Sequence, residues 1–160
     1  ENRYDNPREV GADRLVNAEA AYAKYGGPLI VVDFGTATTF DVVSADGSYL
    51  GGAIYPGVKI AIGALFEKTA KLPRVELVKV DSVIGRNTAA SMQAGMMFGY
   101  VGAVEKIVGR IREELGAPAR VIATGGLSRL IDEQQPGLFH ALDRTLTLDG
   151  LNLIYTRDRH

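Results

Sequence analysis

A polar turn that follows an apolar stretch is the part of this sequence best suited to chemistry. Residues 31–39 read Val-Val-Asp-Phe-Gly-Thr-Ala-Thr-Thr. Asp33 ends the apolar stretch, Gly35 permits close approach of the backbone, and Thr36 adds a hydroxyl group. Backbone N–H and hydroxyl groups at such a turn bind phosphate, and a carboxylate there can hold a cation that screens phosphate charge. The alternative is a hairpin whose Asp and Thr side chains bond only to their own turn, and the local sequence leaves both interpretations open.

A second turn contains the adjacent glycines Gly125 and Gly126, within the segment Ala-Thr-Gly-Gly-Leu-Ser. A short apolar stretch precedes them, and a helix is expected after them. The free N–H groups at the start of that helix would suit an anion or a nucleotide. A tight strand-to-helix turn without any ligand explains the same residues, so this interpretation also stays open.

The segment Gly11-Ala12-Asp13-Arg14 lies near a helix start. An Asp in this position can accept a proton from a substrate hydroxyl. An Arg can bind a substrate carboxylate through two parallel hydrogen bonds. A solvated Asp–Arg pair on a helix surface is the alternative. Further along, Asn87 or Thr88 is a natural helix N-cap, and a substrate contact by Thr88 would be a second role.

Helix signals surround the first of these candidates. The pair Asn-Pro at residues 6–7 is a helix start, and Gly-Gly-Pro at residues 26–28 is a stop, so a helix is expected over residues 6–25. Gly11 interrupts this helix, and residues 7–10 are therefore expected to form a separate turn.

Apolar stretches and turn signals predict a sheet that is followed by helices and further strands. Asp-Gly at residues 46–47 is a hairpin signal. Thr and Leu alternate over residues 145–148, which predicts extended backbone, and the state of residues 151–156 stays open. The pattern is typical of a layered α/β domain. The expected strands cover residues 29–32, 38–43, 48–54 and 120–123, and the expected helices cover residues 58–72, 88–115 and 127–132.

The helix expected over residues 88–115 carries an apolar stripe interrupted by small residues. Its glycines would allow another backbone to approach closely, either within the monomer or across a homodimer interface. The predicted stripe consists of Met92, Met96, Gly99, Ala103, Ile107 and Ile111.

Composition excludes several classes of protein. The 160 residues suffice for one domain. With 18 basic and 19 acidic residues, the sequence lacks the basic character of a general nucleic-acid or membrane-surface binder. The absence of Cys excludes disulfide scaffolds, and His140 and His160 are too few for a multi-His metal site. No apolar run reaches the ~18 residues of a membrane span and no signal peptide opens the sequence, so a cytoplasmic protein is expected.

Taken in order, these segments resemble the type III pantothenate kinase family. The resemblance rests on Asn-Pro, Gly-Ala-Asp-Arg, Asp-Phe-Gly-Thr-Ala-Thr-Thr, Gly-Gly-Ala-Ile-Tyr-Pro-Gly and Ala-Thr-Gly-Gly-Leu, and it runs from about Tyr4 to Tyr155. It implies the actin-like ATPase superfamily, in which two ribonuclease H-like halves enclose an ATP cleft. The implied activity is ATP-dependent phosphorylation of pantothenate to 4'-phosphopantothenate, the first step of coenzyme A biosynthesis.

The resemblance also implies a role for each matching residue. Asp13 corresponds to the general base that takes the proton from the pantothenate hydroxyl, and Asp33 to the ligand of a monovalent cation, K⁺ or NH₄⁺. Thr88 is implied to help complete a site at a homodimer interface. Pantothenate contacts are implied for Tyr4, Gly11, Ala12, Asp13, Arg14 and Thr88, and ATP contacts for Thr36, Gly125 and Gly126.

One motif of the family has no counterpart here. Its members carry an N-terminal half with an Asp-x-Gly-Asn-Thr phosphate loop and a magnesium-binding Asp, and this sequence contains no such motif. The resemblance therefore implies that residues 1–160 form a single domain, the C-terminal half of a two-domain kinase. Mg²⁺ would be held by the absent N-terminal ATP-binding half, and the chain alone is expected to be inactive.

Two other functions stay open. The first is another small-molecule kinase or nucleotide hydrolase of the same superfamily, which would not need Asp13 and Arg14 for its substrate. The second is a non-catalytic regulatory protein that uses the helix at 88–115 as an interface. The set formed by Asp13, Asp33 and Thr36 argues against the second, because a protein without phosphate chemistry has no physical need of it.

Overall fold

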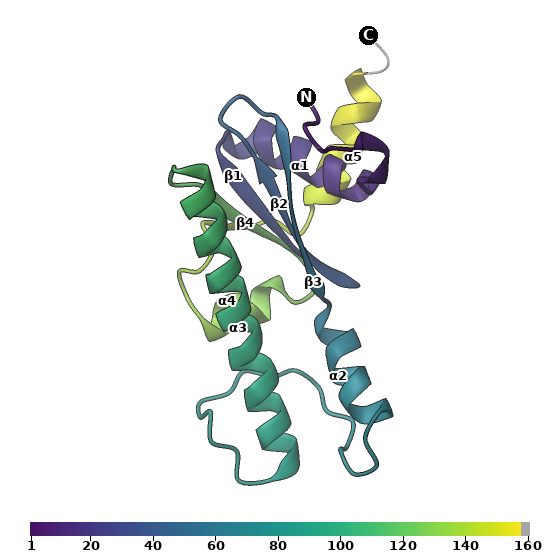
Figure 1. Ribbon diagram of the computed structural model, residues 1–160, viewed down its shortest axis with the longest axis vertical. Helices are drawn as coiled ribbons and strands as arrows, with labels where there is room; N and C mark the ends of the chain where they lie inside the picture. Colours follow the sequence, from purple (N-terminus) through teal and green to yellow (C-terminus); the bar gives the residue numbers. More distant parts are fainter. Residues whose placement is uncertain (158–160) are drawn as a thin grey trace.

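A single mixed β-sheet forms the centre of the computed structural model, which describes residues 1–157 (Figure 1). Within that range the sheet has five strands in the order β3-β2-β1-β4-β5. The first three strands form an antiparallel meander, and β4 returns parallel to β1. The strands are β1 (Leu29–Phe34), β2 (Ala37–Val43), β3 (Tyr49–Pro56), β4 (Arg120–Gly125) and β5 (Ala141–Leu142).

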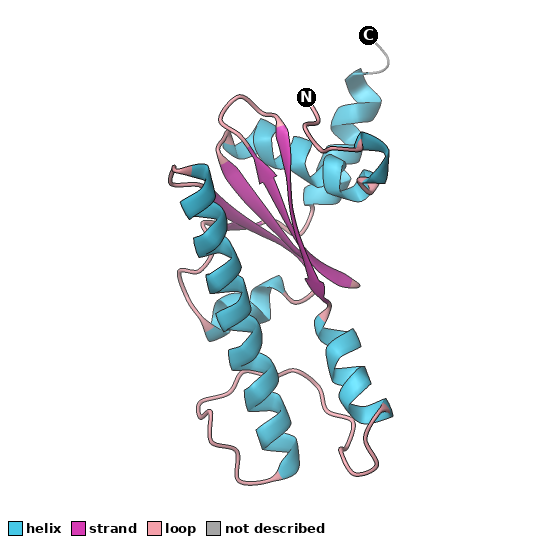
Figure 2. Cartoon of the chain, viewed as in Figure 1, coloured by secondary structure: helices cyan, strands magenta, loops and turns pink. Residues whose placement is uncertain are grey.

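Helices cover both faces of this sheet (Figure 2). The face covered by α1 (Ala12–Tyr25) also carries α5 (Leu146–Arg157), which packs against α1. On the other face lie α2 (Val58–Glu67), α3 (Thr88–Leu115) and α4 (Ser128–Gln134). None of the helices formed within residues 1–157 is long and apolar enough to cross a membrane.

The side chains of β1 point alternately to the two faces of the sheet and pack with the helices on each face. Ile30 and Val32 pack with the α3 side of the sheet, whereas Leu29 and Val31 pack with the α1 side. Successive side chains of a strand point to opposite faces, so a strand covered on both faces is apolar throughout. Burying each such side chain contributes roughly 1.5–3 kcal/mol. This double burial fixes β1, and with it the position of Asp33 near its end.

Most expected elements are confirmed. The break near Gly11 is present, because a 3₁₀ turn at Pro7–Glu9 precedes α1. The helix expected over residues 58–72 ends earlier, at Glu67. Strand β1 reaches Phe34, so Asp33 lies within the strand. The two-residue strand β5 was not expected, and His160 lies outside the described residues.

One expectation is wrong and another is confirmed only in part. Residues 145–148 are not extended, since α5 begins at Leu146 and also includes residues 151–156. The helix forms there because Gly150 lets its backbone approach α1: a Cβ at this position would lie 2.5 Å from the Val16 carbonyl oxygen. The stripe predicted for α3 is confirmed in part: Met92 is buried and Met96, Ile107 and Ile111 pack against the core. Gly99, however, is exposed, and an adjacent row of side chains is buried more deeply. That row includes Met97, Tyr100, Val101, Val104 and Val108.

Candidate active site

The two glycine-containing turns meet at one edge of the sheet. In the parallel register Asp33 lies beside Thr124, and Phe34 lies beside Gly125. Gly125 has a φ of 91°, and a Cβ there would lie 2.6 Å from the Phe34 carbonyl oxygen. Only glycine therefore fits this position without strain. The parallel return of β4 thus brings the predicted cation ligand and the predicted nucleotide turn together.

A cavity of about 360 Å³ opens between these turns. The first turn of α2 forms part of its wall and contributes Lys59, which the sequence analysis did not single out. The start of α2 lies close to the polar turn. A Cβ on Gly57 would lie 1.8 Å from the Thr36 carbonyl oxygen, so the absence of a side chain at Gly57 permits this approach. A helix start and a lysine both favour negative charge in the cavity. The lining residues are Phe34, Gly35, Thr36, Lys59, Ile60, Gly126 and Leu127.

Asp33 is a half-buried carboxylate close to this cavity. One of its oxygens, Oδ2, accepts a hydrogen bond of 3.0 Å from the Asn17 amide. The other, Oδ1, lies toward Gly125, where a Cβ would come within 2.8 Å of it. Burial raises the pKa of Asp33, the Asn17 hydrogen bond lowers it, and the charges of Asp13 and Asp41 raise it further. A cation at Oδ1 would favour the ionised form.

Asp13 and Arg14 lie in the first turn of α1 but point into different surroundings. Asp13 is exposed, and its Oδ1 lies over Gly11, where a Cβ would be 2.6 Å away. Arg14 is buried, and its Nε donates to Asp41 Oδ1 at 2.6 Å. A glycine at position 11 therefore leaves room for the Asp13 carboxylate.

The Arg14–Asp41 pair belongs to a buried polar cluster. Tyr49 donates to Asp41 Oδ1 at 2.8 Å, and Thr39 donates to Asp41 Oδ2 at 3.0 Å. Burial lowers the pKa of Arg14, but the charge and hydrogen bond of Asp41 outweigh this effect and the net pKa is raised. Burial raises the pKa of Asp41, which Arg14, Tyr49 and Thr39 oppose. Any substrate contact by Arg14 would have to use the guanidinium N–H groups that Asp41 leaves free.

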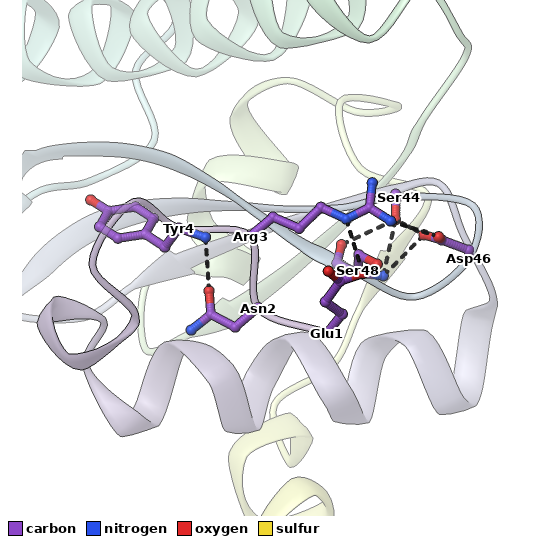
Figure 3. A network of polar contacts seen from close by, with 7 residues as sticks. All are labelled: Glu1, Asn2, Arg3, Tyr4, Ser44, Asp46 and Ser48. Atoms are coloured by element: carbon purple, nitrogen blue, oxygen red, sulfur yellow. Dashed lines mark hydrogen bonds and ion pairs between the residues drawn. The ribbon is translucent and has the colours of Figure 1, made fainter.

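Tyr4 lies on the same side of the sheet as this cluster. Its ring packs against that of Tyr49, with the centroids 6.3 Å apart, and lies 3.3 Å from a Cβ built on Gly51. The segment that carries Tyr4 is held to the β2–β3 hairpin, where Arg3 pairs with Asp46 at 2.9 Å (Figure 3). The structure therefore brings Tyr4 close to the Arg14 cluster.

Thr88 is not brought to these residues. It begins α3 and is exposed, and Asn87 caps the helix by accepting from the Ala90 N–H at 2.9 Å. Figure 1 shows that this end of α3 and α1 lie at opposite ends of the molecule. Gly11 and Ala12, by contrast, adjoin Asp13 at the start of α1. Nowhere in residues 1–157 is there a cluster of three or more His, Cys, Asp or Glu side chains able to hold a metal ion.

The sheet order and the parallel return of β4 define a ribonuclease H-like fold. The fold is shared with a solved protein of Campylobacter jejuni described as a Baf family transcriptional activator. The TM-score is 0.67 at 21% identity, over 96% of this chain and 67% of that one.

Sequence comparison identifies the family. The family model for type III pantothenate kinase matches residues 1–110, and the chain belongs to this family. It is 57% identical to the type III pantothenate kinase of Moorella thermoacetica over 98% of its length and 61% of that protein. It is 56% identical to the enzyme of Myxococcus xanthus over 97% of its length and 60% of that protein. The chain thus spans about three fifths of the length of these relatives.

Proposed function

We propose that this chain is the acceptor-side part of a kinase that phosphorylates pantothenate to 4'-phosphopantothenate with ATP, the first step of coenzyme A biosynthesis. Family membership supports the substrate. The observation that carries the proposal is the position of the exposed Asp13 near a sheet edge that also holds Asp33, Thr36 and Gly125. Acceptor and phosphate functions would then share one edge of the domain.

Asp13 is proposed as the general base. Phosphoryl transfer requires mainly positioning and charge neutralisation, with a carboxylate that accepts the proton of the attacking hydroxyl. An exposed carboxylate at the start of a helix suits that task, because it reaches solvent and substrate alike. Tyr4, Gly11, Ala12 and the free N–H groups of Arg14 would hold pantothenate beside it.

Thr36, Gly125 and Gly126 are proposed to contact ATP, with Lys59 as an additional positive charge. The lysine shares the cavity of about 360 Å³ with Thr36 and Gly126, where it can attract phosphate oxygens. The donors available for phosphate are therefore the Thr36 hydroxyl, the Lys59 ammonium group and the backbone N–H groups of both turns.

A monovalent cation, K⁺ or NH₄⁺, is proposed to bind at Asp33. The residues present fit such an ion, because Oδ1 of this carboxylate and the Phe34 carbonyl oxygen both lie beside Gly125, 2.8 Å and 2.6 Å from a Cβ built there. The bound cation would supply positive charge that screens the phosphates. Mg²⁺ is proposed to be held by an N-terminal half of the enzyme outside residues 1–160.

The complete enzyme is proposed to contain that N-terminal half and to act as a cytoplasmic homodimer. The start of α3, which carries Thr88, lies away from α1, which carries Asp13 (Figure 1), so the proposed pantothenate contact of Thr88 would be made to the site of a second copy. The glycines of α3 support this, since a Cβ at Gly95, Gly99 or Gly102 would meet nothing within 4 Å in this chain. The chain alone is expected to be inactive.

The decisive experiment is a pantothenate phosphorylation assay on the full-length kinase with ATP, Mg²⁺ and K⁺. Asp13→Asn should lower kcat at least a hundredfold, because general-base catalysis contributes about 10²–10⁴-fold. Asp132→Asn, a half-buried carboxylate of α4, is the matched control and should retain activity. Full activity of Asp13→Asn would refute the proposed base, and phosphate transfer only to another alcohol would favour a different kinase of the superfamily.

A further inference from the structure

A buried amide connects α5 to the proposed cation ligand. Asn17 lies on α1 with 1% of its surface exposed. Its Nδ2 donates to Asp33 Oδ2 at 3.0 Å, and its Oδ1 accepts from Thr147 Oγ1 of α5 at 2.7 Å. A buried amide costs free energy unless its hydrogen bonds are made. Both ends of this side chain are satisfied, one in the site and one outside it.

The partners determine which way the amide points. An ionised carboxylate only accepts hydrogen bonds, so the NH₂ group of Asn17 must face Asp33. The carbonyl oxygen then faces Thr147, and the threonine hydroxyl must donate to it. Exchanging the amide oxygen and nitrogen would set two acceptors against each other at Asp33. The network therefore has one direction, from Thr147 through Asn17 to Asp33.

This direction decides how Asp33 presents its oxygens. Oδ2 is occupied by Asn17, while Oδ1 is left toward the turns, 3.7 Å from a Cβ built on Gly35 and 2.8 Å from one built on Gly125. The charges of Asp13 and Asp41 act on the same carboxylate. Among the residues that the structure describes, Asn17 is the one on α1 that donates a hydrogen bond to this carboxylate and so opposes that repulsion.

We infer that Asn17 is a positioning residue that aims Asp33 Oδ1 at the monovalent cation, and that Thr147 of α5 holds Asn17 in the required orientation. The inference rests on the proposed role of Asp33. It gives α5 a function beyond covering α1. A helix that joins the domain on its outer surface sets the geometry of a carboxylate at the sheet edge.

The test measures cation response in the full-length kinase carrying Asn17→Ala, Thr147→Val or Thr147→Ser. Asn17→Ala should raise the K⁺ concentration for half-maximal activity about tenfold or more, because a hydrogen bond to a charged group is lost. The kcat at saturating K⁺ should change much less. Thr147→Val should shift the same concentration about threefold in the same direction, and Thr147→Ser, which keeps the hydroxyl, should restore the native value.

A second measurement does not depend on turnover. The rise in melting temperature on adding KCl, compared with choline chloride at equal ionic strength, reports cation binding directly. This rise should shrink in Asn17→Ala and in Thr147→Val and return in Thr147→Ser. Thr156→Val is the matched control, since that exposed threonine of α5 donates to the Asn152 carbonyl oxygen of its own helix.

The outcomes separate this inference from the proposed function. A native kinase that neither phosphorylates pantothenate nor responds to K⁺ would overturn the proposed function, and this inference with it. A K⁺-dependent native kinase whose folded Asn17→Ala and Thr147→Val variants keep the native K⁺ response would overturn the inference alone. If Asn17→Ala fails to fold, the Thr147→Val and Thr147→Ser pair decides by the same criterion.

Discussion

Two aspartates on neighbouring strands, Asp41 and Asp33, show opposite ways of accommodating a carboxylate. Asp41 of β2 is fully buried and receives hydrogen bonds on both oxygens, from Arg14 and Tyr49 on one and Thr39 on the other. Asp33 of β1 is half-buried and, within residues 1–157, receives one hydrogen bond, from Asn17. Both are met by residues three positions apart on the same helix, α1.

The two carboxylates differ in whether a positive charge neutralises them. A guanidinium partner neutralises Asp41 within the protein, which makes it part of the core. An amide orients Asp33 without neutralising it, which leaves its charge available to a ligand. One turn of α1 thus places the charged Arg14 against Asp41 of β2 and the uncharged Asn17 against Asp33 of β1.

The largest expected effect is on stability and comes from breaking the buried ion pair between Arg14 and Asp41. Asp41→Asn or Arg14→Leu should lower the free energy of unfolding by about 3–5 kcal/mol, because removing one partner leaves the other buried and uncompensated. Urea denaturation followed by circular dichroism measures this.

The double variant Arg14→Met with Asp41→Leu tests the cause. It should recover much of the loss, since an apolar pair of similar volume replaces a buried ion pair at little cost. A double variant as unstable as the single ones would show that the cluster supplies more than charge compensation.

A smaller effect should follow from filling the space beside Asp33. Gly125→Ala forces a side chain into a positive φ and against Phe34 and Asp33, which should cost about 1–3 kcal/mol of stability and weaken ATP binding. Gly109→Ala, on α3 and outside the cavity, is the control, because a Cβ there meets nothing within 4 Å. Thermal unfolding and the KM for ATP are measured for both variants. Equal effects of the two variants would contradict the expectation that the space beside Asp33 is special.

Removing the positive charge of Lys59 from the cavity should weaken ATP binding and leave the fold intact. Lys59→Met should raise the KM for ATP about threefold to tenfold, which corresponds to ~0.7–1.4 kcal/mol. The effect should diminish at high salt because the lysine is exposed. Lys106→Met, another exposed lysine, on α3, should leave the KM unchanged, and a similar rise in both variants would point to a general charge effect.

The smallest effect concerns a third aspartate, Asp46 of the β2–β3 hairpin, which is exposed and is bound by serines of its own turn and by Arg3 (Figure 3). Hydrogen bonds from the Ser44 hydroxyl and from Ser48, together with the charge of Arg3, lower its pKa from 3.8 to about 2. Because the folded state holds the ionised form, its contribution is complete above the unfolded pKa and disappears as pH falls toward 2.

Thermal unfolding of the native protein and of Asp46→Asn across this pH range checks the sign. The stability difference should be small at neutral pH and narrow steadily below pH 4, the region bounded by the two pKa values. A difference that stays constant with pH would show that the carboxylate acts through shape rather than charge.

Local signals predicted the elements well and their side-chain environments poorly. The bounds of α3 and the start of α2 follow from capping residues and from glycine and proline, which act over a few positions. The alternation that suggested a strand at residues 145–148 failed because packing of Gly150 on Val16 outweighs local propensity. Asn17 and Arg14 shared the helical spacing of the buried Ala18 and Ala21, a signal that they face inward.

In the candidate site, too, some residues could be singled out from the sequence and others only from the structure. Residue type and turn chemistry were enough to single out Asp13, Asp33, Thr36 and the glycines at 125–126 from the sequence. Lys59 could not be recognised, because an exposed lysine in a first helical turn is common, and only the cavity it shares with Thr36 and Gly126 distinguishes it. Arg14 was recognised, but its burial beside Asp41 was not.

The sequence by itself determined where chain direction changes and which side chains are of a type suited to chemistry, since these depend on neighbouring positions and on side-chain type. Only the tertiary structure decided which of these residues meet. The parallel return of β4 sets Thr124 and Gly125 beside Asp33 and Phe34, far apart along the chain. The docking of α1 decides that Asp41 is neutralised by Arg14 while Asp33 is only oriented by Asn17, because burial and distance, which set the energy of a charge, exist only once the elements have packed.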